Sequence, residues 1–237
     1  MEGEAKQNPR AVSAIDLFSK SAAIVKKNLN TYALIYFIPA ALMVATTAQS
    51  LQDTVKHPGS FSNFIGQSFF GPNSDATANS ATGILFLVLI VASVIVSLMA
   101  VILNLRAAEG KVPSFSDIWA EFKHKWLKLL GLELSVALIV AAGLILLIVP
   151  GLIFLWRLSI APYVLVGQNT GVREAISKSW EMTKGHAWAI YSIFIITVVF
   201  SALGMIPVAG QIISFVLATL YAAALPLRYL EIKKIPK

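Results

Sequence analysis

Residues 82–105 read TGILFLVLIVASVIVSLMAVILNL, a run without a single charged side chain. An α-helix rises about 1.5 Å per residue, so a helix over this run is long enough to cross the roughly 30 Å hydrocarbon core of a bilayer. A surface helix of a soluble protein keeps one polar face, and this run has none. We therefore predict that residues 82–105 form a transmembrane helix.

The composition of the whole chain agrees with this local prediction. Its 237 residues are 57% apolar and only 13% charged, whereas soluble domains carry roughly 25% charged residues. The absence of cysteine excludes disulfide and thiolate chemistry. Five further apolar segments are expected to span the bilayer, at residues 32–51, 129–149, 152–167, 187–206 and 211–229. The predicted fold class is an all-α polytopic membrane protein with six transmembrane helices.

The positive charges predict the orientation of these helices. Nearly all of the 19 Lys and Arg residues fall before the first span, between the second and third, between the fourth and fifth, or after the sixth. Lys56 stands on the opposite side, and Arg157 lies inside a span. By the positive-inside rule we expect both termini in the cytoplasm of a bacterial cell, with the protein in the inner membrane. The net charge of +7 then indicates contact with anionic lipid headgroups rather than with nucleic acid.

Short connections predict hairpins. Pro150-Gly151 and residues 206–210 leave room only for tight turns, so spans three and four, and five and six, are expected to pair antiparallel. The first hairpin is opened by an external loop at residues 52–81, which is either a linker or a segment whose phenylalanines enter the outer interface or a partner surface. We expect residues 1–10 to be disordered and residues 11–237 to form one membrane domain.

Each hairpin is expected to follow a cytoplasmic amphipathic helix that lies in the membrane interface. The apolar stripes are Ile15, Phe18, Ala22, Val25 and Leu29 in the first, Trp119, Phe122 and Trp126 in the second, and Val172, Ile176 and Trp180 in the third. Ser114 or Ser116 can cap the second helix. In the third, Glu174 and Lys178 can pair at i, i+4, and Gly185 is suited to end the helix. The predicted architecture is a threefold repeat of an interfacial helix and a hairpin.

A series of residues between positions 148 and 195 has a recognisable order. It consists of Pro150-Gly151, Arg157, Ala161-Pro162-Tyr163, Glu174-Ala175-Ile176, Ser179-Trp180 and Thr183-Lys184-Gly185. This stretch resembles the membrane domain associated with glycerophosphoryl diester phosphodiesterases and related uncharacterised bacterial integral membrane proteins. In those phosphodiesterases a separate soluble barrel supplies catalysis, and we expect no such barrel in the eight residues after Tyr229. The resemblance implies a free-standing membrane module in which these residues form a structural motif.

Arg157 is the main candidate for a functional residue, because a charge within a span is costly and faces a partner or water. Two roles remain open: a structural role, in which the side chain snorkels outward or binds backbone carbonyls, or, with Ser159 nearby, a site for an anionic group. Glu133 is not expected to pair with Arg157, since their depths along the hairpin differ by roughly 16 Å. Pro162 frees the carbonyl of Leu158 and is expected to kink the fourth span.

Signals for catalysis are weak. The three histidines, His57, His124 and His186, lie outside the spans and share no metal-ligand spacing. No motif for a metalloprotease, a serine hydrolase or a phosphate-binding loop is present. We therefore expect no catalytic residues, no metal and no cofactor. The leading hypothesis is a non-enzymatic envelope scaffold or accessory subunit that contacts a partner protein or a second copy of itself. The alternative is a small transporter or lipid-handling protein that uses Arg157 for an anionic group, and an intramembrane enzyme ranks third.

Overall fold

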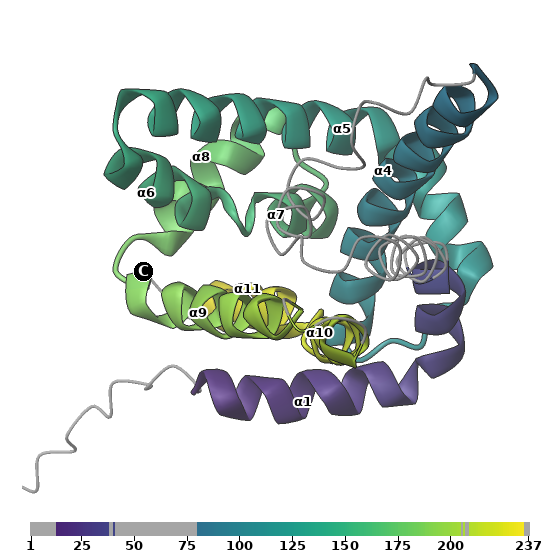
Figure 1. The fold of residues 1–237 in the computed structure, drawn as a ribbon. Coiled ribbons are helices and arrows are strands. Elements are labelled where there is room, and N and C mark those ends of the chain that lie inside the picture. The colour runs from purple at the N-terminus through teal and green to yellow at the C-terminus, as the bar shows by residue number, and fades with distance from the viewer. Residues whose placement is uncertain (1–12, 38–39, 41–79, 205, 207–208, 235–237) are drawn as a thin grey trace, which may run out of the picture.

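The computed structural model describes residues 13–37, 40, 80–204, 206 and 209–234, and within them the chain is helical and contains no strand (Figure 1). Residues 29–37 are also helical and follow α1 after a one-residue turn. The remaining elements are α1 (Ala14–Lys27), α4 (Ser80–Ala108), α5 (Phe115–Leu146), α6 (Ile148–Leu158), α7 (Ala161–Gln168), α8 (Val172–Thr183), α9 (Ala187–Leu203), α10 (Ala209–Leu220) and α11 (Ala224–Lys234).

Four helical segments are long and apolar enough to cross a membrane. They are Val91–Ala108 of α4, Phe115–Leu146, the α6–α7 pair (Ile148–Gln168) and the α10–α11 pair (Ala209–Lys234). A fifth follows if α8 and α9, which are bent by 102° to one another, count as one broken span. These helices are those of a multi-pass membrane protein. Most of the predicted first span (32–51), the predicted disordered residues 1–10 and the external loop 52–81 lie outside the described residues.

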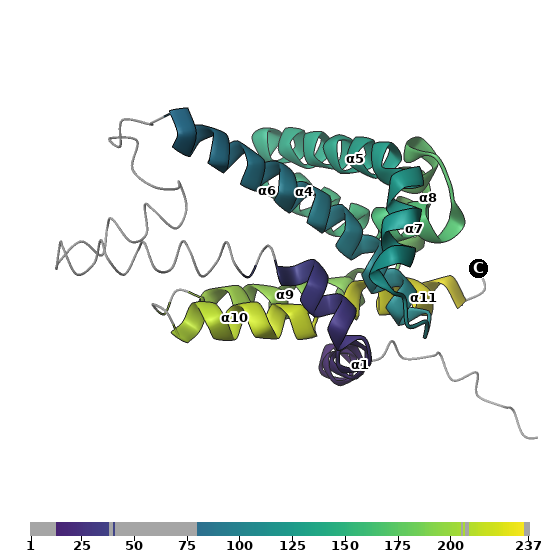
Figure 2. The same ribbon diagram turned by 90° about the vertical axis from the view of Figure 1, so that its right-hand side faces the viewer.

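A packed body lies at one end of the molecule. The second half of α4, the first half of α5, α7 and residues 29–37 share one core, in which Leu103, Leu132 and Val164 are fully buried. α8 and α11 pack around this core, and α1 packs against α11, α10, α9 and α4. Figure 2 shows α7, α8 and α11 gathered at one end, while α10 and the start of α4 extend toward the other.

Apolar side chains are exposed away from this body. Beyond Leu132, only Gly143 of α5 is buried, and Leu138 is 63% exposed. On the α9–α10 pair, Val198 is 65% exposed and Ile212 is 50% exposed. Soluble monomers rarely expose so large a contiguous apolar surface. A bilayer covers such a surface, which agrees with the spans identified by length and composition.

Three prolines determine where three of the helices end. A proline ring clashes with the carbonyl of the residue four positions earlier and lacks an N–H to bond it. α5 and α6 each end at that residue, and α10 ends two residues before it. The prolines and the carbonyl residues are Pro150 with Leu146, Pro162 with Leu158, and Pro226 with Ala222. The kink predicted at Pro162 is therefore confirmed as a full break at residues 159–160.

The proline rule also corrects two predicted boundaries. The turn expected at Pro150-Gly151 lies instead at Leu147, an extended residue with φ −163° and ψ 144°, and both predicted turn residues belong to the first turn of α6. The sixth span, expected to be continuous from 211 to 229, is interrupted by a turn at residues 221–223. Most of the predicted 206–210 turn lies outside the described residues or at the start of α10.

The interfacial helix predicted before the third span is not a separate element. α5 runs unbroken from Phe115 to Leu146, so its amphipathic start and its apolar end are one helix. No proline interrupts it, and a single glycine inside a helix costs only about 1 kcal/mol relative to alanine. The predicted cap is confirmed, because Ser114 and Asp117 form a reciprocal capping box. Within the predicted stripe, Phe122 is buried while Trp119 and Trp126 are 39% and 43% exposed.

The face predicted for the first amphipathic helix is only partly correct. Val25 is buried and Phe18 packs against a buried cluster, but Ile15 and Leu29 are 77% and 59% exposed. Leu17 and Ser21, which the predicted stripe did not include, are buried. The cause is that α1 packs against other helices, and the face toward them includes a serine whose hydroxyl has backbone partners there. A hydrophobic stripe alone cannot identify such a face.

The third amphipathic helix agrees better with its prediction. Val172 and Ile176 of α8 pack against the main core. The Glu174–Lys178 pair forms at 2.8 Å, and Gly185 adopts the left-handed conformation, with φ +84°, directly after the helix. Its most buried positions are Ala175, Ser179 and Thr183, which the stripe did not include.

Candidate functional site

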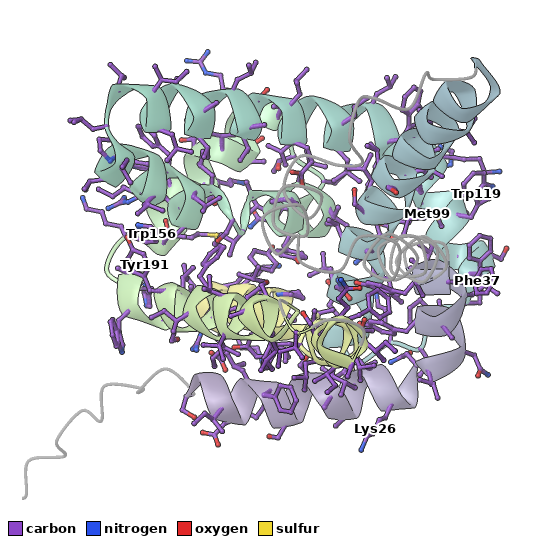
Figure 3. The ribbon with its side chains drawn as sticks, viewed as in Figure 1. Lys26, Phe37, Met99, Trp119, Trp156 and Tyr191 are labelled. Carbon is purple, nitrogen blue, oxygen red and sulfur yellow. The ribbon has the colours of Figure 1, made fainter. Side chains whose placement is uncertain are left out.

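The Arg157 side chain lies between two indole rings near the end of α6. Its guanidinium carbon is 4.2 Å from the Trp180 ring centroid and 5.1 Å from that of Trp156. Nη1 donates a long hydrogen bond of 3.4 Å to the Trp180 carbonyl. Trp156 in turn packs against Tyr191 of α9, with the ring centroids 5.2 Å apart (Figure 3). Among the described residues, no carboxylate lies within ion-pairing distance of Arg157.

Hydroxyl groups satisfy the carbonyls that the break after α6 leaves free. The last four carbonyls of a helix have no partner inside it. Ser179 donates to the Arg157 carbonyl at 2.6 Å, and Thr183 adds a longer contact of 3.4 Å. Ser159 donates to the Trp156 carbonyl at 2.8 Å. The hydroxyls of Ser159 and Ser179 are therefore both bonded to backbone carbonyls. Ser159 acts within the end of α6, whereas Ser179 and the Arg157 side chain hold α8 against the end of α6.

The predicted motif residues occupy two places. Arg157, Ser179 and Trp180 come together at the α6–α8 contact. Gly151 lies at the other end of α6, where its backbone approaches α5 so closely that a Cβ at Gly143 would lie 2.9 Å from the Gly151 Cα. Pro150 and Pro162 determine where α5 and α6 end, and neither proline is among the residues that contact the Arg157 side chain. The motif is therefore a set of packing positions on successive helices rather than one constellation.

Glu133 and Arg157 do not pair, as the depth argument predicted. No ion pair links them in the described part of the chain. Glu133 lies near Tyr163 of α7, with which it interacts electrostatically.

A buried polar contact in the main core was missed by the sequence analysis. The Tyr32 hydroxyl donates to Asn104 Oδ1 at 2.8 Å, and both side chains are buried. The Tyr36 ring stacks on the Tyr32 ring with centroids 5.9 Å apart. The available signal was Asn104 itself, an amide near the end of an otherwise apolar span. This contact joins residues 29–37 to α4.

A charged network joins α4, α5 and α7. Arg106 binds Glu121 with two hydrogen bonds of 2.9 and 2.6 Å and also binds Glu109 at 2.9 Å. Lys125 donates to Glu121 at 2.7 Å and to the Val166 carbonyl at 3.0 Å. Paired carboxylate and guanidinium groups with this geometry hold helices in register. Here the charges neutralise one another, so the network is a structural feature.

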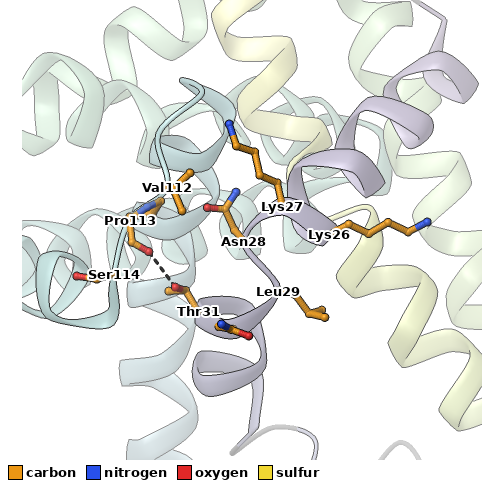
Figure 4. Close-up of a pocket in the computed structure, with 9 residues that line it drawn as sticks. Lys26, Lys27, Asn28, Leu29, Thr31, Val112, Pro113 and Ser114 are labelled. Carbon is orange, nitrogen blue, oxygen red and sulfur yellow. Dashed lines mark hydrogen bonds between the residues drawn. The ribbon is translucent and has the colours of Figure 1, made fainter.

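A pocket of about 400 Å³ lies where the last turn of α1 meets the connection before α5 (Figure 4). Lys27, Asn28 and Thr31 line one side, and Val112 and Pro113 line the other. The Thr31 hydroxyl donates to the Pro113 carbonyl at 2.9 Å, which ties the two sides together. No acidic residue is among the described residues that line the pocket. We call it the Lys27 pocket; the sequence analysis identified none of its residues as a site.

A second pocket of about 360 Å³ shares Val112 and Pro113 with the Lys27 pocket but differs in charge. Its cations are Arg106 and Lys111, and both are paired with Glu109 or Glu121. The Lys27 pocket is thus the more basic of the two.

In the described part of the chain, no three His, Asp or Glu side chains are grouped so that they could hold a metal ion. No protein family, curated protein or solved structure matches the chain. The resemblance drawn from residues 148–195 therefore stays a prediction, and function is argued from the geometry alone.

Proposed function

We propose that the protein is a non-enzymatic, multi-pass scaffold or accessory subunit of a bacterial inner membrane that works through contacts with a partner protein. The observation that carries the proposal is an apolar tip, formed by residues 144–149 where α5 turns into α6. Its side chains are 45% to 86% exposed. They are Leu144, Ile145, Leu146, Leu147, Ile148 and Val149. At the left of Figure 1 this turn lies at the edge of the molecule.

The side chains of the apolar tip must be shielded from water. Burying one large apolar side chain is worth about 1.5–3 kcal/mol, so six of them left in water would cost roughly 10 kcal/mol. Lipid tails can cover the side chains but cannot bond the backbone. α6 begins without a side-chain cap and Pro150 has no N–H, so the N–H groups of Ile148 and Val149 are the ones that lack a partner from that source. A partner protein with carbonyl groups at this position would cover the apolar side chains and accept those hydrogen bonds.

The polar groups of the body favour a structural role. Ser159, Ser179 and Thr183 donate to backbone carbonyls, and the Arg106 network neutralises its own charges. A catalytic site needs a nucleophile, a base and free donors in one pocket. The side chains with such chemistry near the α6–α8 contact already serve to hold helices together.

The proposed orientation places the packed body on the cytoplasmic side. α1 carries Lys26 and Lys27 in its last turn, α4 carries Arg106 in its last turn, and the α4–α5 connection carries Lys111. These elements lie toward the end of the molecule opposite the start of α10 (Figure 2). The positive-inside rule then orients α10 and the apolar tip away from the cytoplasm.

Transport or lipid handling through Arg157 is the second candidate. It is favoured by one observation, the absence of a carboxylate partner for Arg157 among the described residues. Against it, two tryptophans enclose the guanidinium, and the two described pockets lie elsewhere. We therefore place this function second.

A site-specific photocrosslinker distinguishes a protein cover from a lipid cover. A benzophenone side chain is placed at Leu147, which is 67% exposed on the apolar tip, and separately at Leu127, which is 64% exposed near the start of α5. The proposal expects one discrete protein adduct from position 147 in intact membranes and none of that size from position 127. Lipid adducts alone at both positions, with a monomeric protein after mild solubilisation, would refute the scaffold proposal.

A further inference from the structure

The Lys27 pocket is formed where the chain leaves α1 and turns toward the membrane. Residues 29–37 lead from it into the predicted first span, so the pocket lies at the depth of the cytoplasmic headgroups. Its two sides come from segments distant in sequence, residues 26–31 and 112–114, and the Thr31–Pro113 hydrogen bond holds them together. The pocket is therefore built by the tertiary structure and is absent from either segment alone.

The charge of the Lys27 pocket favours an anion. Lys27 extends past Asn28 toward Val112, whereas the neighbouring Lys26 points away to the other side (Figure 4). Neither lysine forms an ion pair with a described residue, in contrast to Arg106 and Lys111 in the adjoining pocket. One lysine ammonium is thus directed into the pocket without a counter-charge.

Besides the Lys27 ammonium, the pocket lining includes a hydrogen-bond acceptor, the Asn28 side chain. Its side chain is 3% exposed, and its Nδ2 donates to the Ile24 carbonyl at 2.9 Å. Its Oδ1 is buried and has no hydrogen-bond partner among the described residues. A buried acceptor without a donor costs about 1–3 kcal/mol, which a ligand hydroxyl or ammonium would remove.

An apolar path leads away from the pocket. Leu29 lines the pocket and is 59% exposed, and Leu34 and Phe37 on the same helical segment are 56% and 69% exposed. Figure 3 places Phe37 at the edge of the molecule. A free phosphate would use none of these side chains, whereas an acyl chain would cover them. The combination fits an amphiphile rather than a soluble anion.

We propose that the Lys27 pocket binds the headgroup of a glycerophospholipid that carries a hydrogen-bond donor, such as a phosphatidylglycerol or phosphatidylethanolamine. Lys27 pairs with the phosphate, Asn28 Oδ1 accepts from the headgroup hydroxyl or ammonium, and an acyl chain lies along Leu29 and Phe37. The inference depends on the protein being embedded in a membrane and is independent of the scaffold proposal.

Native mass spectrometry of the full chain in detergent tests this site. The protein is titrated with phosphatidylglycerol, phosphatidylethanolamine and phosphatidylcholine of equal acyl length, and the lipid-bound fraction is measured. We expect both donor-bearing lipids to bind more tightly than phosphatidylcholine, which has no headgroup donor. Lys27→Ala should weaken phosphatidylglycerol binding about fivefold, the effect of one lysine near a membrane surface.

Lys20→Ala is the matched control, because it removes the same charge from an exposed position of α1 that does not line the pocket. It should change binding less than twofold. Equal losses in the two variants, or none in either, would overturn the site in favour of diffuse surface charge. Equal binding of all three lipids would overturn the assignment to Asn28. Displacement of phosphatidylglycerol by inorganic phosphate at the same concentration would assign the pocket to a soluble anion and overturn the lipid proposal.

Discussion

Arg157 illustrates how a costly residue is accommodated near the end of an apolar helix. Its charge lies over the faces of Trp156 and Trp180, and its backbone carbonyl accepts from Ser179. The favourable quadrupole of an indole ring partly replaces the water that the guanidinium loses. The same residue therefore joins α6 to α8 through both its side chain and its backbone.

Removing this side chain should destabilise the α6–α8 contact. We expect Arg157→Ala to lower the free energy of unfolding by about 2 kcal/mol, the sum of two partly desolvated cation–π contacts. Arg157→Lys should recover only part of the loss, because an ammonium cannot stack flat between the rings. Unfolding in detergent, followed by tryptophan fluorescence, measures the change.

Arg173→Ala, at an exposed position of α8, is the control for loss of a positive charge and should leave stability unchanged. A stable Arg157→Ala protein that has lost binding of an anionic solute would instead support the transport hypothesis.

Ser21 provides a second test at the level of single residues. Its hydroxyl donates to the Leu220 carbonyl at 2.6 Å and accepts from the Ala223 N–H at 3.1 Å, across the break between α10 and α11. Ser21→Ala leaves two buried backbone groups without partners, so we expect a loss of about 1–3 kcal/mol in the free energy of unfolding. Ser19→Ala changes an exposed position of α1 and should have little effect on the free energy of unfolding. Similar stability of the two variants in the same unfolding assay would contradict the bridging role.

Prolines and glycines determine how the helices are divided and how closely they pack. Pro150, Pro162 and Pro226 interrupt what composition alone reads as continuous apolar segments. Gly143 and Gly151 then let α5 and α6 approach until their backbones nearly touch. Small residues play this role in membrane helices because lipid gives no hydrophobic driving force for helix association.

The α5–α6 contact is predicted to be sensitive to a single methyl group. A Cβ at Gly143 would lie 2.6 Å from Phe154 Cδ2 and 2.9 Å from the Gly151 Cα, so Gly143→Ala must push the helices apart. We expect a loss of about 1–3 kcal/mol, as for other overpacked sites. Gly131→Ala in the same helix meets its nearest atom at 3.8 Å and should be neutral or slightly stabilising. Thermal unfolding in detergent compares the two, and equal stabilities would argue against close backbone packing.

At the scale of the whole molecule, the described helices form a packed body and apolar helices that extend from it (Figure 2). The buried Tyr32–Asn104 contact and the partly buried Arg106 network belong to the body, while the apolar tip and the α9–α10 pair expose aliphatic side chains. This division by polarity along one direction is the arrangement expected of a protein that is partly in the bilayer and partly at its surface.

The proposed topology can be read by cysteine labelling, since the natural chain contains no cysteine. His124→Cys, at an exposed position near the start of α5, should react with a membrane-impermeant maleimide only after intact cells are permeabilised. Leu147→Cys, on the apolar tip, should react poorly in both conditions because lipid or a partner covers it. Labelling of position 124 in intact cells would reverse the orientation, and rapid labelling of position 147 would place the tip in water.

The amino-acid sequence by itself predicted an all-helical membrane protein, because uncharged apolar runs of this length and number fit a bilayer. The described residues contain four or five candidate spans, so the arrangement of six spans in three hairpins stays a prediction. The sequence also predicted a cap at Ser114 or Ser116, the stop at Gly185 and a kink at Pro162, which depend on local backbone chemistry. Local rules were insufficient for α5, where the interfacial and spanning parts proved continuous, and for α1, whose buried face depends on a serine bonded to a distant helix break.

Only the tertiary structure decided which polar side chains pack or bond against other helices and which line a pocket. It placed Arg157 between two tryptophans and joined residues 26–31 to residues 112–114 around the Lys27 pocket. The physical reason is that hydrogen bonds and stacking act over a few ångströms between residues far apart in the chain. Their positions therefore follow from how the helices pack and not from the hydrophobic pattern that places those helices in the membrane.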